Sequence, residues 1–534
     1  MAPGPHVTCW DDLPVEIIEY IALYLDPPSL LSFGKVNRIS NRVALTRLLG
    51  RRAANDILSS SSVSIPRFSP IELMPAISAA LWLPPISHID YSPIRHDIGT
   101  FMDDIHCLIR LISPSPPDSL ETLRLRFLLF DRKEVNRCLK ELRRPSISLK
   151  TWLRLMSGLV DTALSKGCKT LDIGGSLFPY LRIPGSSPGL IARVCHMVQT
   201  ASRFLHHPGA ASMAQSFKLE SLTIGICELL SPPFLSYTLG ILRKSAHTLQ
   251  HLEFCFSWPA ITARSWANLF GSLSLPSLKT LVITGGSYFP LSPRVLRAFL
   301  SRHPSIIHLE LKFTFINADS TPIGLRRPIL PNLQTLQAWP HVVVWLLSSP
   351  PSTRRHERDN IWYPSLESVT ILPNIRLSTS KDLLAVTQAI LSLNHVLPIH
   401  SGTKAPRPLP HMTLRMSLFQ TCWIRWIEEN AENQVVNLPL PALLGRDLSD
   451  SKIQRMTLAL DHSIHPDFLQ NPGLPSSIAR WLSLFSSLEE LEIVPCPFTD
   501  TTKNEQLRHE IMQRCTSLKM LKLTISDQIS PMLL

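Results

Sequence analysis

Residue types that carry out catalysis or bind metals are present in this chain, but their spacing does not form a recognisable site. Two imidazoles stand side by side at His206 and His207, and two more lie three residues apart at His462 and His465. Neither pair has the further Cys or His that a zinc site needs, so exposed loop histidines are the better interpretation. The sequence contains no phosphate loop, Gly-x-Gly-x-x-Gly or His-Glu-x-x-His motif. We therefore expect a non-catalytic protein with no metal and no cofactor.

The ten cysteines are scattered from Cys9 to Cys515 without a Cys-x-x-Cys pair. This usage argues against a disulfide scaffold and fits a reducing compartment. The N-terminus has no basic segment followed by an apolar run, which argues against a signal peptide. Apolar stretches such as 342–347 fall far short of the ~20 residues that span a bilayer. We expect an intracellular protein, cytoplasmic or nuclear or both, with no membrane partner.

The formal net charge is +12, but the basic residues occur as small groups and not as one block. The pairs are Arg51-Arg52, Arg143-Arg144 and Arg326-Arg327, with a further group at 354–358. None lies among stacked aromatic residues in a recognisable nucleic-acid module. We interpret the charge as a solvated surface and do not expect a nucleic-acid partner.

The most informative stretch is residues 12–38, where apolar residues recur at intervals of three to five. Pro14 stands where a first helix would begin, and Asp26-Pro27-Pro28 would separate it from a second helix. About 40 residues are too few to bury a substantial core of their own. The apolar stripe is therefore suited to packing against a partner.

This arrangement resembles the F-box, which docks on the Skp-type adaptor of a cullin ubiquitin ligase. The resemblance implies an adaptor-binding domain at 8–55. Its adaptor-facing residues would be Leu13, Pro14, Ile17, Ile21, Leu25, Leu30 and Val36. Many family members carry an aromatic residue four positions after the Val, where this chain has Ser40. That departure could weaken the third helix or shift its register. It leaves open whether adaptor binding is retained.

A short phrase, Leu-x-x-Leu-x-Leu/Ile, recurs after residue 115 and is usually preceded by Ser or Lys. Eight clear copies begin at Leu219, Leu249, Leu278, Ile306, Leu333, Leu366, Leu488 and Leu518. Looser copies begin at Leu120 and Cys168 and lie near Met412 and Ile453. The first six clear copies start 30, 29, 28, 27 and 33 residues apart.

This phrase and period resemble the leucine-rich repeat. The resemblance implies a solenoid in which each phrase is a strand of a concave parallel sheet, since stacked repeats bury leucines that one repeat cannot. The expected fold class is thus α/β: a short all-α F-box helical hairpin, then an irregular leucine-rich-repeat solenoid over 116–530. Residues 56–115 are predicted as a linker or an N-terminal cap. The segments near 348–360 and 398–410 are predicted as loop insertions.

Strand alternation predicts which side chains leave the core. Residues flanking the central Leu would project from the concave face, and the charged members of that set sum to −3 although the whole chain is basic. Such a face is a poor surface for a phosphate backbone and better suited to a protein target. The candidate target-binding residues are Glu253, His308, Glu310, Lys312, Trp339, Glu490 and Glu492, with Trp339 as an aromatic anchor. Ordinary solvated positions, with the target bound elsewhere, are an equal alternative.

Together the two resemblances imply a substrate-recruiting F-box subunit of an SCF-type cullin ubiquitin ligase. Its partners would be the Skp-type adaptor, through it a cullin, and an unknown protein substrate. The alternative is a leucine-rich-repeat interaction scaffold not engaged in a ubiquitin ligase. That alternative predicts that Leu13, Ile17 and Ile21 pack onto the first repeats. A nucleic-acid-binding solenoid ranks third.

Overall fold

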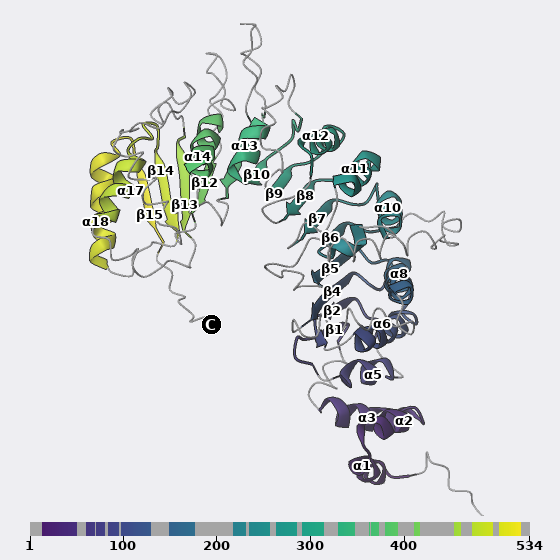
Figure 1. Cartoon of the computed structure of the whole chain (residues 1–534). Helices are drawn as coiled ribbons and strands as arrows, with labels where there is room; N and C mark the ends of the chain where they lie inside the picture. The colour runs from purple at the N-terminus through teal and green to yellow at the C-terminus, as the bar shows by residue number, and fades with distance from the viewer. Residues whose placement is uncertain are drawn as a thin grey trace, which may run out of the picture. The chain divides into compact units, whose positions relative to one another are not determined.

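The computed structural model describes most of the helices and strands of the chain. The described residues are 13–50, 60–69, 71–80, 84–95, 98–129, 149–176, 217–230, 234–256, 263–285, 291–313, 329–347, 363, 365–372, 380–393, 411–416, 453–460, 473–494 and 501–524. They form two compact units (Figure 1). The first unit is 1–256 with 260–265 and 272–277, and the second is 257–259, 266–271 and 278–534.

The first unit begins with three short helices, α1 (Val15–Leu23), α2 (Pro27–Phe33) and α3 (Arg38–Leu49). Pro14 is the N-cap of α1. The Asp26 carboxylate accepts a hydrogen bond from the Ser29 amide at 2.9 Å and caps α2, whose first residue is proline. The Asn37 side chain caps α3 in the same way, accepting from the Ser40 amide at 2.8 Å. Local capping thus begins two of these three helices.

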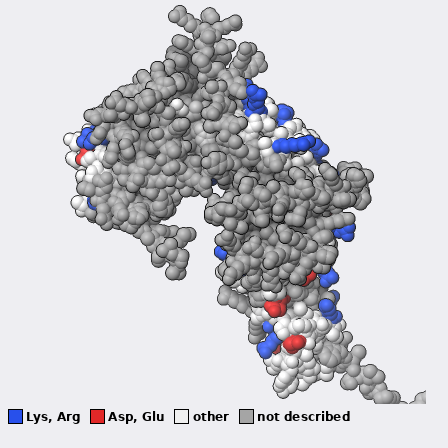
Figure 2. Space-filling model, in the orientation of Figure 1, with Lys and Arg blue, Asp and Glu red and all other residues white. Residues whose placement is uncertain are grey.

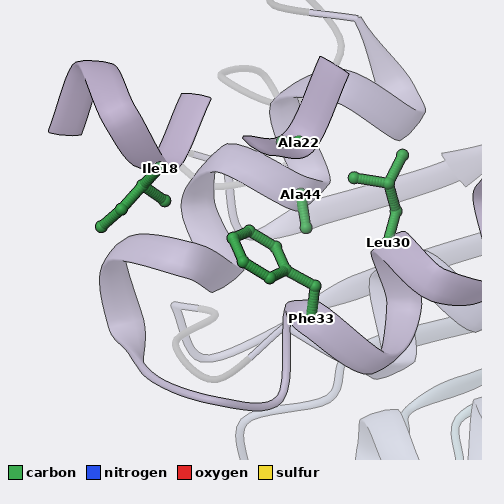
Figure 3. Close-up of a cluster of buried hydrophobic side chains, with 5 residues drawn as sticks. All are labelled: Ile18, Ala22, Leu30, Phe33 and Ala44. Carbon is green, nitrogen blue, oxygen red and sulfur yellow. The ribbon is translucent and has the colours of Figure 1, made fainter. Parts of the chain in front are cut away.

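These helices share a small core of five buried side chains, two from α1, two from α2 and one from α3 (Figure 3). They are Ile18, Ala22, Leu30, Phe33 and Ala44. Helix α3 also packs against α5 (Leu73–Ser78). At that junction the Asn41 side-chain amide donates to the carbonyl of Gly34 at 2.7 Å and to that of Ala79 at 2.8 Å. A buried amide therefore ties the helical domain to the rest of the first unit.

The rest of the first unit is a parallel sheet covered by helices. Its strands are β1 (Ser62–Ile65), β2 (His88–Tyr91), β3 (Ile94–Arg95), β4 (Thr122–Leu129), β5 (Thr170–Ser176), β6 (Ser221–Ile224) and β7 (His251–Cys255). The order is β1-β2-β4-β5-β6-β7, and β3 pairs with β4. The helices are α5, α6 (Ile98–Ile112), α8 (Leu149–Ser165), η2 (Cys227–Leu230) and α10 (Phe234–Lys244). Helix α11 (Ala263–Ser272) is divided between the two units.

Strands β1 and β2 lie within 56–115, which we expected to be a linker or cap. Both pair in parallel register with their neighbours, Val63 with Ile89 and Ile89 with Leu123. The sheet therefore starts before residue 116. These two strands lack the leucine phrase and bury Val, Ile and Tyr side chains instead.

The second unit repeats the same plan. Its strands, in sheet order, are β8 (Thr280–Thr284), β9 (His308–Lys312), β10 (Thr335–Ala338), β11 (Ser368–Ile371), β12 (His411–Met416), β13 (Arg455–Leu460), β14 (Glu490–Val494) and β15 (Met520–Leu523). The described helices are α12 (Pro293–Ser301), α13 (Pro340–Leu347), α14 (Ser380–Leu393), α17 (Leu474–Leu482) and α18 (Thr501–Arg514). All eight clear copies of the phrase and all four looser copies supply strands of the two units.

In both units the leucines face the helices and the alternate residues do not. Strand β8 shows the pattern, with Leu281 and Ile283 fully buried and the three residues between and beside them half-buried. We call the side of each sheet opposite its helices the open face (Figure 1). On the helix side of the second unit, Trp266, Phe270 and Phe299 pack with ring centroids 5.2 and 4.4 Å apart. Burying aromatic rings and leucines here is the main favourable term in folding.

The polar residue that precedes many copies of the phrase has a structural role. Its side chain donates a hydrogen bond to a carbonyl of the preceding repeat, as Ser305 does to Leu278 at 2.9 Å and Ser517 to Leu488 at 2.9 Å. Asn332 donates in the same way to Pro304 at 3.0 Å. These bonds satisfy carbonyls at the turns and fix the stacking of neighbouring repeats.

Candidate partner-binding surfaces

The N-terminal helices expose apolar side chains that the sequence predicts to face an adaptor. Ile17 is 46% exposed and Val36 is 59% exposed, and Pro14 is also exposed. Leu13, Ile21 and Leu25 are only half-buried, and they pack against the small helical core.

Leu30 does not belong to that exposed set. Its side chain is only 4% exposed and lies in the helical core with Phe33 and Ala44 (Figure 3). The reason is that α2 is short and packs on α3, so the inner side of α2 is needed to hold the three helices together. The prediction of Leu30 as an adaptor-facing residue is corrected accordingly.

Helix α1 exposes a larger apolar patch than the sequence indicated. We define this α1 patch as Val15, Ile17, Tyr20, Leu23 and Tyr24, all more than two-fifths exposed. The Tyr24 hydroxyl donates to the Tyr20 hydroxyl at 2.8 Å, and the rings meet edge-to-face at 5.1 Å. That hydrogen bond raises the pKa of Tyr24. The spacing of four residues between the two tyrosines was the available sequence signal, because such residues share a helix face.

The scaffold alternative predicted that Leu13, Ile17 and Ile21 pack onto the first repeats. In the structure, the helix that packs against α5 is α3, and Ile17 remains 46% exposed. Ser40 is fully buried within α3, which runs regularly over twelve residues. The small side chain at this position therefore does not break the third helix.

The open face of the first unit carries a cluster of charged residues in its middle row. Register places Arg124, Asp172, Thr223 and Glu253 side by side on β4 to β7. The Arg126 guanidinium donates to one Asp172 oxygen at 2.6 Å, while the other oxygen has no hydrogen-bond partner among the described residues. Asp172 is 8% exposed, and this burial raises its pKa although Arg126 opposes the shift.

Glu253 belongs to this cluster but is held differently. Hydrogen bonds from His251 and Thr223 lower the pKa of the Glu253 carboxyl, against the effect of its partial burial. Arg126 was missed from the sequence because it lies just beyond the six-residue phrase, in a strand that continues to Leu129. Its alternation with Arg124 was the signal that could have found it.

Most of the candidate charges of the second unit already have a neighbouring side-chain partner. Glu310 forms an ion pair with Lys312, and His308 shares a hydrogen bond with the Thr335 hydroxyl. Glu492 accepts from the Lys522 ammonium at 2.5 Å, and register sets Glu490 beside Arg455. These residues lie at strand positions that alternate with buried leucines and isoleucines, on the open face. Exposed ion pairs of this kind add little stability.

Trp339 is not an exposed anchor. It is 9% exposed, and its ring meets His341 edge-to-face at 6.2 Å. Strand β10 ends at Ala338 and α13 begins at Pro340, so the alternation of the strand stops before Trp339. The side chain therefore packs into the core, and the prediction of an open-face aromatic is wrong.

Basic residues gather on the helix side (Figure 2). Helix α10 carries Arg243 and Lys244, and α12 carries Arg294 and Arg297, and neither helix contains an acidic residue. In the described part of the chain, no group of three potential metal ligands forms a cluster. No described helix is long and apolar enough to cross a membrane. The segments 348–360 and 398–410, and the histidines at 206–207 and 462–465, lie outside the described residues.

Comparison with known proteins supports the assignment of the helical domain. Residues 10–52 match the F-box domain model. No curated protein matches the chain. Among solved structures, the leucine-rich repeat-containing protein LegL7 from Legionella pneumophila matches at 14% identity and a TM-score of 0.27, over 62% of this chain and 91% of that one. The chain thus carries an F-box domain, followed by a parallel sheet most of whose strands come from the leucine phrases.

Proposed function

We propose that this chain is the substrate-recruiting subunit of an SCF-type cullin ubiquitin ligase. The N-terminal helices would bind a Skp-type adaptor, and through it a cullin, while the open faces of the sheet would bind the protein to be modified. The chain itself would carry out no bond chemistry. It would act by proximity, raising the local concentration of target lysines near the transfer centre. This role places the protein inside the cell.

The observation that carries the proposal is the exposed apolar surface of the F-box domain. The α1 patch, which includes Ile17, and Val36 leave apolar side chains in water. The helix that packs against α5 is α3, so this contact does not cover Ile17. A monomer gains nothing from leaving large apolar side chains in water, and exposed apolar surface of this kind often marks a protein interface. Burying Ile17 in a partner would recover about 1 kcal/mol or more.

The test is capture of the full chain by a purified Skp-type adaptor, comparing wild type with Ile17→Asp. Ile17 is far enough exposed that Asp should leave the melting temperature unchanged, while a buried carboxylate at the interface should lower adaptor affinity at least about thirtyfold. Met512→Asp is the matched control, because Met512 is 50% exposed on α18, outside the F-box. Wild type that is not captured would instead favour the scaffold.

A further inference from the structure

The open face of the second unit contains a hollow of about 300 Å³ over strands β8 to β11. Two rows of side chains line it, and register sets the members of each row side by side. The first row is Thr280, His308, Thr335 and Ser368. The second row is Val282, Glu310, Gln337 and Thr370. These eight positions alternate along their strands with buried apolar residues. The two rows therefore lie on the open face.

Four polar side chains in the hollow have no hydrogen-bond partner among the described residues. They are Thr280, Gln337, Ser368 and Thr370. Three of them are hydroxyls, and one is an amide with two donors and an acceptor. A ligand that displaces water from this hollow must supply both donors and acceptors, or it leaves these groups unsatisfied.

The charged groups of the hollow are already committed. Glu310 is paired with Lys312, and the His308 ring shares a hydrogen bond with Thr335. The described lining contains no Arg or Lys. A phosphate or carboxylate would therefore meet the Glu310 carboxylate without a free cation, and a basic group would have to compete with Lys312.

The dimensions match a short stretch of extended chain. Four neighbouring strands span about 14 Å, since strands lie ~4.8 Å apart, and an extended peptide advances ~3.3 Å per residue. About four residues would cross the hollow. Each peptide unit offers one N–H and one carbonyl, which is what the Gln337 amide and its neighbouring hydroxyls can pair with.

We propose that this hollow binds an extended, uncharged segment of about four residues, mainly through its backbone. The proposal rests on the proposed function only in naming the bound protein as the ligase target. It specifies that the bound segment is not phosphorylated. Recognition by an arginine cluster, the usual means of reading a phosphate, is absent from the described lining.

The test measures binding of the full chain to four matched sets of synthetic ten-residue peptides: uncharged polar, basic, acidic and phosphoserine-containing. The uncharged set should bind best. Gln337→Ala and Thr370→Val should each weaken that binding about fivefold, because each removes hydrogen bonds to the peptide. Thr413→Val is the matched control, since Thr413 lies in the same row on β12, beside Thr370 but outside the hollow. It should bind like wild type.

Preference for the acidic, phosphoserine or basic set would overturn the proposal, as would an equal loss in Thr413→Val or the absence of binding to every set. Adaptor capture by the same protein preparations separates this result from the proposed function. A chain that captures the adaptor but binds none of the peptides would refute only the proposed peptide binding in the hollow. A chain that selects uncharged peptides without capturing the adaptor would refute only the ligase role.

Discussion

Helix α1 and strand β8 differ in how far their apolar side chains are exposed. In α1, Ile17 and Leu23 are 46% and 50% exposed, whereas Leu281 and Ile283 of β8 are fully buried. The strand has neighbours on both sides and helices over one face, so each leucine meets several elements. The three N-terminal helices have one small core and cannot cover their outer surfaces. The F-box domain therefore offers apolar surface to a partner, and the sheet offers polar surface.

The largest effect should come from the sheet core. Leu281→Ala should lower the free energy of unfolding of the second unit by about 3 kcal/mol, because it leaves a cavity in a fully packed layer. Ile17→Ala should change stability by less than about 0.5 kcal/mol, since its side chain is half in water. Urea denaturation of both variants measures the difference. Equal losses would mean that Ile17 is packed and would remove the contrast between the two regions.

An intermediate effect should appear at the junction between the two regions. Asn41→Ala removes the hydrogen bonds to the Gly34 and Ala79 carbonyls. The Gly34 carbonyl is then buried without its amide donor. The expected loss is about 2 kcal/mol. Hydrogen exchange of α3 should accelerate in the variant while that of β8 stays unchanged. Unaltered exchange in α3 would show that packing alone holds the helical domain on α5.

The smallest effect should be a pH dependence on the open face of the first unit. Burial raises the pKa of Asp172 above its ordinary value of 3.8, although Arg126 opposes the shift. A carboxyl group with a raised folded-state pKa contributes most to stability below 3.8, and this contribution falls as pH rises toward the folded-state pKa. Asp172→Asn removes that fall, so its stability relative to wild type should improve as pH rises from about 4.

Denaturation of wild type and Asp172→Asn across a pH series measures this change. A wild type that gains stability over the variant in the same range would mean that the Arg126 ion pair outweighs burial. In that case the Asp172–Arg126 pair would contribute to stability as an ion pair does. It would then resemble the Glu492–Lys522 pair of the second unit, and the charged groups of the two open faces would behave alike.

Much of the fold was predictable because its signals are local. Each leucine phrase encodes a strand with one buried side, and Asp26 and Asn37 begin helices through hydrogen bonds to amides three residues further along. Strands β1 and β2 were not predicted because Val63, Ile89 and Tyr91 replace the leucines. Their strand conformation depends on pairing, because β1 pairs with β2 and β2 pairs with β4, which begins about thirty residues after β2.

The sequence by itself determined the order of the elements, the alternation within each strand and the F-box helices, because these depend on spacings of two to four residues. Only the tertiary structure decided which of the predicted surface residues stay exposed. Leu30 and Trp339 are buried because neighbouring helices and turns close over them. Arg126 reaches Asp172 across 46 residues of chain because register aligns β4 with β5. Burial and pairing at such distances follow from packing, which no local pattern encodes.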